Sequence, residues 1–254
     1  MERRDHAEEP GLTTIQRLGR EELEELVRDR IAKLTESEAI AVLRNPYSNR
    51  AVCELIAGAR ALTSFYSVQL QLVRHRHTPP PHSLRFVPHL YWSDLVRLSI
   101  DVRIPPMVRR AMDEQLLVRL QKMTSGEKIS IGRLCSQTIL NVLLFEQDRR
   151  IFASVLINPR LVEADLVRLI NSGKASVDQL TMIGENAKWS SRNEIRRALV
   201  LNPRTPKAVA ASQLRRMPIS LLRDLSRDRR LSLYLRRCIE NLQSHPAKRS
   251  ATGL

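Results

Sequence analysis

Apolar residues recur at helical spacing along this chain. Residues 20–34 show the pattern most clearly, because their leucines, valine and isoleucine are three or four positions apart and form one stripe on a helix. Leu, Ala, Arg and Glu dominate the composition, whereas aromatic residues make up only 4% and there are only 8 glycines. Because strands favour β-branched and aromatic residues, this balance predicts an all-α protein.

Several predicted helices end at the dipeptide Asn-Pro, which occurs at Asn45-Pro46, Asn158-Pro159 and Asn202-Pro203. Asn tolerates the left-handed conformation that closes a helix, and Pro suits the first position of the next helix. We therefore expect each Asn-Pro to join two consecutive helices tightly. Elsewhere, Ser191 is expected to begin a helix through a capping box with Glu194.

The sequence also contains a long internal repeat. Residues 72–116 align without a gap on residues 199–243, at an offset of 127. The identical residues include Thr78 and Thr205, Asp101 and Asp228, Arg103 and Arg230, and the pairs Arg109-Arg110 and Arg236-Arg237. An offset of this size is about three units of the ~40–47 residues typical of helical-pair repeats. The chain is therefore predicted to be a stack of helix pairs.

The predicted organisation has four parts. Residues 1–14 lack periodicity and are predicted to be disordered, as is the basic tail 244–254. Residues 15–124 are predicted to form an N-terminal helical capping segment and a first repeat array, and residues 125–243 a second array. The first helix is acidic and is expected to cap the stack, because a terminal repeat needs a polar outer face. A role in dimerisation is the alternative, and the sequence leaves the oligomeric state open.

A recurring turn carries a resemblance to known repeat proteins. The turn Leu-x-Asn-Pro-[Arg/Lys]-[Leu/Thr] or a related sequence occurs at residues 156–161, 189–191, 201–206 and 228–231. On these residues the chain resembles the degenerate HEAT-like repeat proteins of bacteria, relatives of the leucine-rich-variant repeats. The resemblance implies a HEAT-like α-solenoid of about five or six antiparallel helix pairs. Leucine-rich-variant proteins can hold a cysteine-ligated iron–sulfur cluster, but the cysteines of this chain are not clustered, so no cofactor is predicted.

Positive charge is concentrated toward the end of the sequence. The formal net charge is +15, and residues 189–254 carry 15 basic and only 4 acidic side chains. Residues 39–145 carry 14 basic and 6 acidic side chains, whereas residues 1–38 are acidic. Concentrated positive charge attracts acidic protein surfaces or nucleic acid. The alternative is that arginine serves only as a soluble, helix-compatible surface residue.

Seven arginines near the C-terminal end are the candidate binding residues. Ile195, Ala198 and Leu199 mark the buried side of the helix around 190–201, which leaves the arginines of that helix exposed. The predicted arginine face consists of Arg192, Arg196, Arg197, Arg215, Arg216, Arg236 and Arg237. In stacked repeats these positions would form a ridge that could hold an acidic helix or phosphate groups. The alternative is that some of these side chains bind the last carbonyls of helices.

The cysteines and histidines were considered as metal ligands. Cys53, Cys135 and Cys238 are far apart and are predicted to be small buried residues in a reducing, cytoplasmic protein. Four histidines, His75, His77, His82 and His89, lie close together in the sequence and could bind zinc or nickel. No Asp, Glu or Cys lies among them, so a loop of solvated histidines is preferred and no metal site is predicted. The chain has no apolar run long enough to predict a membrane span.

The sequence motifs of common enzymes are absent. Gly-rich phosphate loops, H-E-x-x-H and G-x-S-x-G do not occur. We therefore predict a non-enzymatic scaffold whose arginine face binds an acidic protein surface. A nucleic-acid binding protein that contacts phosphates is the alternative. A HEAT-like DNA glycosylase using Trp92, Asp94 and Arg97 is the least favoured, because it rests on fold analogy alone and tryptophans more often anchor helix layers.

Overall fold

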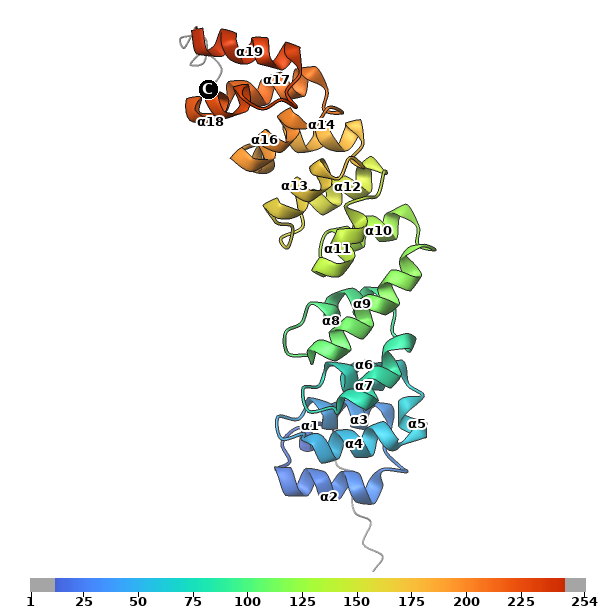
Figure 1. Ribbon diagram of the computed structural model, residues 1–254. Coiled ribbons are helices and arrows are strands. Elements are labelled where there is room, and N and C mark those ends of the chain that lie inside the picture. The colour runs from blue at the N-terminus through green and yellow to red at the C-terminus, as the bar shows by residue number, and fades with distance from the viewer. Residues whose placement is uncertain (1–11, 245–254) are drawn as a thin grey trace, which may run out of the picture. The chain divides into compact units, whose positions relative to one another are not determined.

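The computed structural model of the protein describes residues 12–244. All regular secondary structure in these residues is helical, so the prediction of an all-α protein is confirmed (Figure 1). The chain divides into two compact units, Met1–Lys122 and Met123–Leu254. The boundary lies next to Thr124-Ser125-Gly126, where the hydrophobic pattern of the sequence is interrupted.

Unit 1 contains helices α1 to α9 in its described part. Their bounds are α1 Leu12–Ile15, α2 Arg20–Arg30, α3 Glu36–Arg44, α4 Arg50–Gly58, α5 Arg60–Thr63, α6 Tyr66–Arg74, α7 Pro80–Phe86, the 3-10 helix η1 Val87–His89, α8 Trp92–Ser99 and α9 Pro106–Leu120. Helices that are near in sequence pack together, such as α2 on α4, α3 on α6 and α8 on α9 (Figure 1). Residues 12–14, which were expected to be disordered, belong to α1, and residues 1–11 lie outside the described part.

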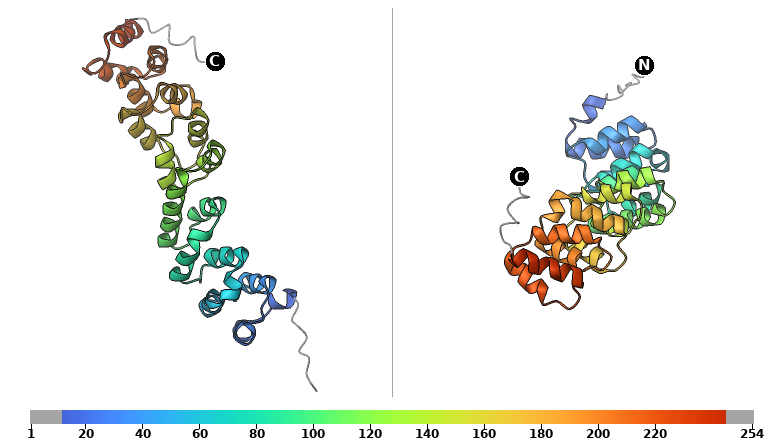
Figure 2. Two further views of the ribbon diagram at one scale, coloured as in Figure 1. Left: turned by 90° about the vertical axis from the view of Figure 1, so that its right-hand side faces the viewer. Right: turned by 90° about the horizontal axis from the view of Figure 1, so that it is seen from above.

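Unit 2 contains helices α10 to α19. Their bounds are α10 Ser125–Gly132, α11 Gln137–Leu143, α12 Arg149–Leu156, α13 Glu163–Asn171, α14 Val177–Glu185, α15 Ala187–Ser190, α16 Asn193–Leu201, α17 Lys207–Arg215, α18 Ile219–Ser226 and α19 Leu233–Ser244. Neighbours in sequence again pack together, including α10 on α12, α12 on α14, α14 on α17 and α17 on α19 (Figure 1). Figure 2 shows the same helices, coloured from green to red, from two further sides. The tail predicted to be disordered lies outside the described residues, except for Ser244.

Side chains from later helices bind the C-terminal carbonyls of earlier helices in both units. The last four carbonyls of an α-helix have no partner within the helix. The Asn158 amide donates to the Gly132 carbonyl at 2.9 Å, and the Trp189 indole donates to the Leu156 carbonyl at 3.0 Å. Similar bonds join Asn45 to Ile15, Arg85 to Ala57, Arg119 to Leu90, Gln179 to Leu144, Asn202 to Ile170, Arg204 to Gly173 and Gln213 to Gly184. Each bond therefore fixes a helix to one that ended roughly 30 residues earlier.

Turns between helices repeat one hydrogen-bond pattern. The side chain of the first turn residue accepts the backbone N–H two residues later, and its carbonyl accepts the N–H three residues later. This first residue is Asn45, His75, Asp101, Asn158, Asn202 or Asp228. We expected asparagine to close the helix by adopting the left-handed backbone conformation. Its side chain closes the turn instead, by accepting a backbone N–H. No non-glycine residue between 12 and 244 has a positive φ, and Asn45 is extended at φ −65°.

The expectation that Pro46 begins a helix is also wrong. Pro46 lies inside the turn, and α4 begins only at Arg50. Pro46 directly follows Asn45, whose carbonyl accepts the Ser48 N–H at 3.0 Å. The fixed φ of proline is favourable at this second position of a turn. Asn-Pro therefore ends one helix and shapes the turn, and the following helix has a cap of its own at Asn49.

The internal repeat of the sequence is visible in local structure. Helices α7 and α17 begin 127 residues apart, at Pro80 and Lys207, and the same offset relates the starts of α8 and α18 and of α9 and α19. The repeated Asp-x-Arg turn makes the same ion pair in each copy, at 2.7 Å between Asp101 and Arg103 and at 2.8 Å in the second copy. The gapless alignment therefore predicted corresponding helices correctly.

The helix cap expected at Ser191 is not formed. The hydroxyl of Ser191 donates to the Lys188 carbonyl, and α16 begins only at Asn193. The segment before it forms the separate short helix α15, which Asn186 caps through bonds to two backbone N–H groups. Burial of Trp189 in this short helix fixes it in place, so the chain turns before α16 starts.

The apolar stripes predicted for unit 2 are buried. Ile195, Ala198 and Leu199 are all no more than 5% exposed. The last helices share a core formed by Val200, Ala210, Leu214, Met217, Leu222, Leu225, Leu231, Leu235 and Ile239. Because these residues face the core, the opposite sides of α16 to α19 are exposed to solvent and carry the polar residues. Within residues 12–244, no helix combines the length and the apolar character that crossing a membrane would require.

Candidate anion-binding sites

The arginine face is more varied in the structure than the sequence predicted. Arg192, Arg197, Arg215, Arg216 and Arg237 are exposed, as expected from the burial of the opposite helix sides. The remaining two members, Arg196 and Arg236, are half-buried. Five of the seven side chains are therefore accessible to a partner, and two are used by the fold.

Arg196 links two turns of unit 2. Its guanidinium donates to the Ser190 carbonyl at 2.5 Å and to the Arg216 carbonyl at 2.6 Å. Burial, together with the nearby charge of Arg216, lowers the pKa of Arg196. The helical pattern could not reveal this role, because the accepting carbonyl belongs to the end of a different helix. The prediction that Arg196 is exposed is wrong.

Arg236 is held against the turn before its own helix. Its guanidinium donates to the Asp228 carbonyl at 3.4 Å, and its Nε atom is buried without a hydrogen-bond partner in the described structure. Asp228 is already engaged, because hydrogen bonds from Arg230, together with the charges of Arg230 and Arg197, lower the pKa of this carboxyl to about 2. The predicted exposure of Arg236 is therefore also wrong, and Arg197 lies near a carboxylate.

The contacts separate the arginine face into two groups. Arg216 is next to Arg196 at the C-terminal end of α17, whereas Arg197 and Arg236 are near Asp228 at the turn before α19. Arg237, one residue further along α19, makes no hydrogen bond or ion pair within the described residues.

Exposed apolar side chains accompany both groups. Ile219 is 46% exposed at the start of α18, just after Arg216. Leu233 is 66% exposed and Tyr234 is 46% exposed at the start of α19, three and four residues before Arg237. On a helix these spacings place side chains on the same side. The surface around the arginines is therefore a mixture of guanidinium groups and apolar groups.

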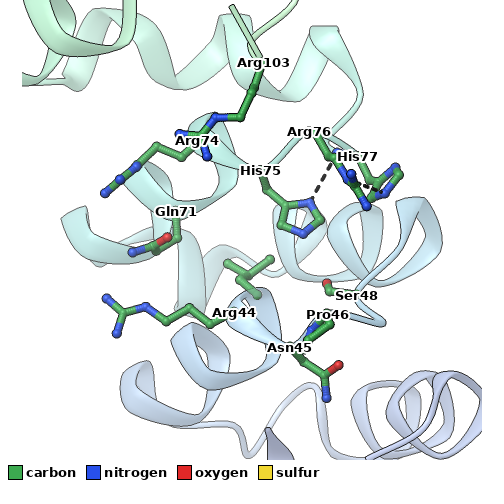
Figure 3. A pocket seen from close by; sticks show the side chains of 11 residues that line it. Arg44, Asn45, Pro46, Ser48, Gln71, Arg74, His75, Arg76, His77 and Arg103 are labelled. Carbon is green, nitrogen blue, oxygen red and sulfur yellow. Dashed lines mark hydrogen bonds between the residues drawn. The ribbon is translucent and has the colours of Figure 1, made fainter. Parts of the chain in front are cut away.

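A second concentration of positive charge lies in unit 1, in a groove of about 610 Å³. Three successive turns contribute to it, namely those after α3, α6 and α8 (Figure 3). We call it the basic groove and define it by the side chains of Arg44, Gln71, Arg74, His75, Arg76, His77 and Arg103 together with Asn45, Pro46 and Ser48 of the first turn. None of the described residues that line it is Asp or Glu.

The arginines of the basic groove differ in how they are held. Arg44 and Arg74 end α3 and α6, are exposed, and make no hydrogen bond within the described part of the chain. Arg76 donates to the His77 ring at 3.0 Å, and Arg103 is paired with Asp101 at 2.7 Å. Two guanidinium groups are therefore free to bind a ligand without breaking a bond in the protein.

His75 lines the groove and lies between the turn of Asn45, Pro46 and Ser48 and the side chain of Arg103 (Figure 3). Its Nδ1 accepts the N–H of His77 at 3.3 Å and lies 3.1 Å from the Cys53 sulfur. Burial lowers the pKa of His75, and the charges of His77 and Arg76 act in the same direction, so the ring is favoured in its neutral form. Burial raises the pKa of the Cys53 thiol, which suits a structural rather than a nucleophilic cysteine.

The sequence pattern marked His75 and His77 as candidate metal ligands, together with His82 and His89, but gave no such sign for the arginines around them. The rings of His75 and His77 lie side by side, with centroids 5.6 Å apart. Across residues 12–244, no group of three His, Cys, Asp or Glu side chains is arranged to hold a metal ion. The excess of basic residues between 39 and 145 was the signal that could have drawn attention to the groove.

The residues considered for a glycosylase have structural contacts. Asp94 accepts a hydrogen bond of 2.5 Å from the Tyr66 hydroxyl, and the Tyr66 ring packs on that of Tyr91 with centroids 4.4 Å apart. Trp92 is half-buried on the same helix, and Arg97 is exposed. Asp94 is thus an anchor between α6 and α8.

Comparisons with protein-family models, curated proteins and solved structures gave no match to this chain. The two candidate sites are therefore judged by their own geometry and charge.

Proposed function

We propose that this protein is a non-enzymatic helical-repeat scaffold, a HEAT-like α-solenoid of about five or six helix pairs, whose arginine face binds an acidic protein surface. The repeat architecture is supported by the helices that recur at an offset of 127 residues and by the recurring turn. Such proteins commonly bind partners over extended surfaces formed by equivalent residues of neighbouring repeats. The proposal would assign the C-terminal part of unit 2 to partner binding.

The observation that carries this proposal is the unpaired charge on unit 2. Arg192, Arg215, Arg216 and Arg237 are exposed, and their side chains make no hydrogen bond or ion pair within the described residues. Their guanidinium groups therefore keep all donors free for carboxylates of a partner, which arginine can bind in a bidentate manner. The arginines used by the fold, such as Arg196, do not have this freedom.

The apolar neighbours favour a protein partner over nucleic acid. Leu233, Tyr234 and Ile219 are exposed beside the arginines, and arginine and tyrosine are enriched in the cores of protein interfaces. A surface that contacts only phosphates has no need for exposed leucine and isoleucine. Binding of nucleic acid through phosphates remains the second candidate, because the excess of basic residues is large.

The proposal is tested by charge reversal at one exposed member of each group. We expect Arg216→Glu/Arg237→Glu to weaken the binding of a labelled, glutamate-rich amphipathic peptide by at least about tenfold, because charge-assisted bonds are replaced by repulsion. The matched control is Arg133→Glu/Arg149→Glu, which makes the same change of net charge at exposed positions elsewhere in unit 2. Fluorescence anisotropy of the full chain measures both.

Equal affinities of the two variants would contradict the proposal, since binding would then depend on net charge and not on the arginine face. Circular dichroism of each variant establishes that it remains folded. Side chains without hydrogen bonds were chosen so that loss of the fold does not imitate loss of binding.

A further inference from the structure

The basic groove has a property that surface arginines usually lack, because several positive groups converge there without a matching acidic lining. Arg44, Arg74, Arg76 and Arg103 come from three successive turns, and His75 lies between them (Figure 3). Asp101 lies beside the groove and is bound to Arg103; that pairing chiefly lowers its pKa, and the charge of Arg74 acts in the same direction. Uncompensated charges in one groove repel each other, so an anion placed among them would be stabilised.

The usual role of an arginine at a helix end does not account for this groove. Arg85, Arg119 and Arg204 each donate to a carbonyl at the end of an earlier helix. Arg44 and Arg74 occupy the last positions of α3 and α6, yet neither donates to a carbonyl in the described structure. Their guanidinium groups are left available on the side of the groove that Gln71 also lines.

We propose that the basic groove of unit 1 binds a small molecule that carries at least two phosphate groups. This inference does not depend on the proposed role of the arginine face, which lies in unit 2.

The arrangement of donors suits phosphate better than carboxylate. Each guanidinium can offer a pair of parallel N–H donors, and a phosphate group presents three acceptor oxygens and more negative charge than a carboxylate. Ser48 adds a hydroxyl that lies at the groove and is only 3% exposed. The Ser48 oxygen has no nitrogen or oxygen partner in the described structure. The neighbouring Cys53 thiol is only a weak hydrogen-bonding group.

The number of positive groups in the groove favours more than one phosphate. Four guanidinium groups from three turns line the groove, whereas a single phosphate group carries a charge of only about −2 and presents three acceptor oxygens. A di- or triphosphate group can extend from one turn to the next. The volume of the groove, about 610 Å³, is within the range of small-molecule sites.

The composition of the groove argues against single-stranded nucleic acid. Such strands are commonly bound by stacking of their bases on aromatic side chains. No Phe, Tyr or Trp is found among the described residues that line the groove. A compact polyphosphate is therefore the ligand that the observations favour, and nucleic acid becomes an outcome of the test.

The experiment is calorimetric titration of the full chain with sodium tripolyphosphate at low ionic strength. We expect one site, and we expect Arg44→Gln/Arg74→Gln to weaken binding by about tenfold or more, because two charge-assisted contacts are lost. The control Arg60→Gln/Arg110→Gln removes two exposed charges of unit 1 outside the groove and should leave the affinity within about twofold. Inorganic phosphate should bind more weakly than tripolyphosphate.

A second pair of variants separates charge from geometry. Arg44→Lys/Arg74→Lys keeps the charge but removes the paired donors, so it should bind with intermediate affinity. None of these variants removes a hydrogen bond of the described structure, so they are expected to fold, which circular dichroism checks.

The proposal is overturned by any of three results. The first is the absence of tripolyphosphate binding at low ionic strength by the folded wild-type chain. The second is an equal loss of affinity in the groove and control variants, which would show attraction to net charge alone. The third is tighter binding of random duplex DNA or polyglutamate that the groove substitutions weaken, which would assign the groove to a macromolecule.

Discussion

At the scale of single residues, an asparagine in a turn can both close the turn and bind the end of an earlier helix. The Asn158 side chain is fully buried, its oxygen accepts the Arg160 N–H at 2.8 Å, and its amide donates to the Gly132 carbonyl at 2.9 Å. One side chain thus closes its own turn and binds the end of the earlier helix α10. Aspartate at the same position, as in Asp228, closes the turn but pairs with Arg230 instead.

Substitution of Asn158 measures this double role. We expect Asn158→Ala to lower the free energy of unfolding by about 1–3 kcal/mol, because a buried carbonyl and a backbone N–H lose their partners. The control Asn241→Ala, at an exposed position of α19, should change stability by less than about 0.5 kcal/mol. Urea denaturation of both variants provides the measurement, and equal stabilities would contradict the assigned role.

His75 replaces asparagine in one turn and makes that turn sensitive to pH. Burial lowers the pKa of His75 in the folded protein, so the unfolded chain binds the proton more readily. The stabilisation by the neutral ring is complete above the unfolded pKa of about 6.5 and is lost as the pH falls below it. The groups around the ring are Arg44 from α3, Cys53 from α4, Arg74, Arg76 and His77 from its own segment, and Asp101 and Arg103 after α8.

The substitution His75→Asn tests the pH effect with the turn preserved. Asparagine should accept the His77 N–H as asparagines do in the other turns, and Asn158 has a cysteine neighbour, Cys135, at 3.5 Å just as His75 has Cys53. Between about pH 7.5 and pH 5.5, the wild type should lose more thermal stability than the variant. Parallel curves of melting temperature against pH would show that His75 does not contribute.

At the scale of helices, the sequence pattern predicted most of the helices. It failed to predict the exposure of side chains that bind a neighbouring helix or turn. The stripe Ile195, Ala198 and Leu199 was read correctly, since burial within one helix follows from its own spacing. Arg196 and Arg236 were expected on the surface, but each reaches a carbonyl of another segment. Such long side chains have partners that local periodicity cannot show.

The basic groove was missed for a related reason. Its arginines lie at 44, 74, 76 and 103, and only the stacking of three turns brings them together. The sequence did show the equivalence of the turns at Asp101 and Asp228, but it gave no reason to place Arg44 beside Arg74. Predicting this site required knowing that α3 packs on α6.

Close helix packing in unit 2 depends on Gly184 of α14. A Cβ atom at this position would lie 2.5 Å from the Val209 Cγ1 of α17. We expect Gly184→Ala to lower the free energy of unfolding by about 1–3 kcal/mol, because the strain exceeds the gain in helix propensity. At Gly58 of α4 a Cβ would meet nothing within 4 Å, so Gly58→Ala should be neutral or stabilising. Thermal denaturation compares the two, and destabilisation of both equally would contradict the packing argument.

At the scale of the whole molecule, the same turn and corresponding helices recur at an offset of 127 residues, while the surface residues around them differ. In unit 1 these differences produce a groove suited to phosphate groups. In unit 2 they leave arginines beside Leu233 and Tyr234, a mixture suited to an acidic protein. The excess positive charge of the chain would thus serve two different kinds of partner.

The measurement that tests the central claim most directly is the salt dependence of binding by the full chain. The glutamate-rich amphipathic peptide and random duplex DNA are titrated at about 50 mM and about 200 mM salt. A protein-binding surface with apolar contacts should hold the peptide at both salt concentrations with a modest loss of affinity, and should bind DNA more weakly at the higher one. Failure to bind the peptide even at low salt, or tighter binding of DNA that falls by about a thousandfold or more between the two conditions, would contradict the account.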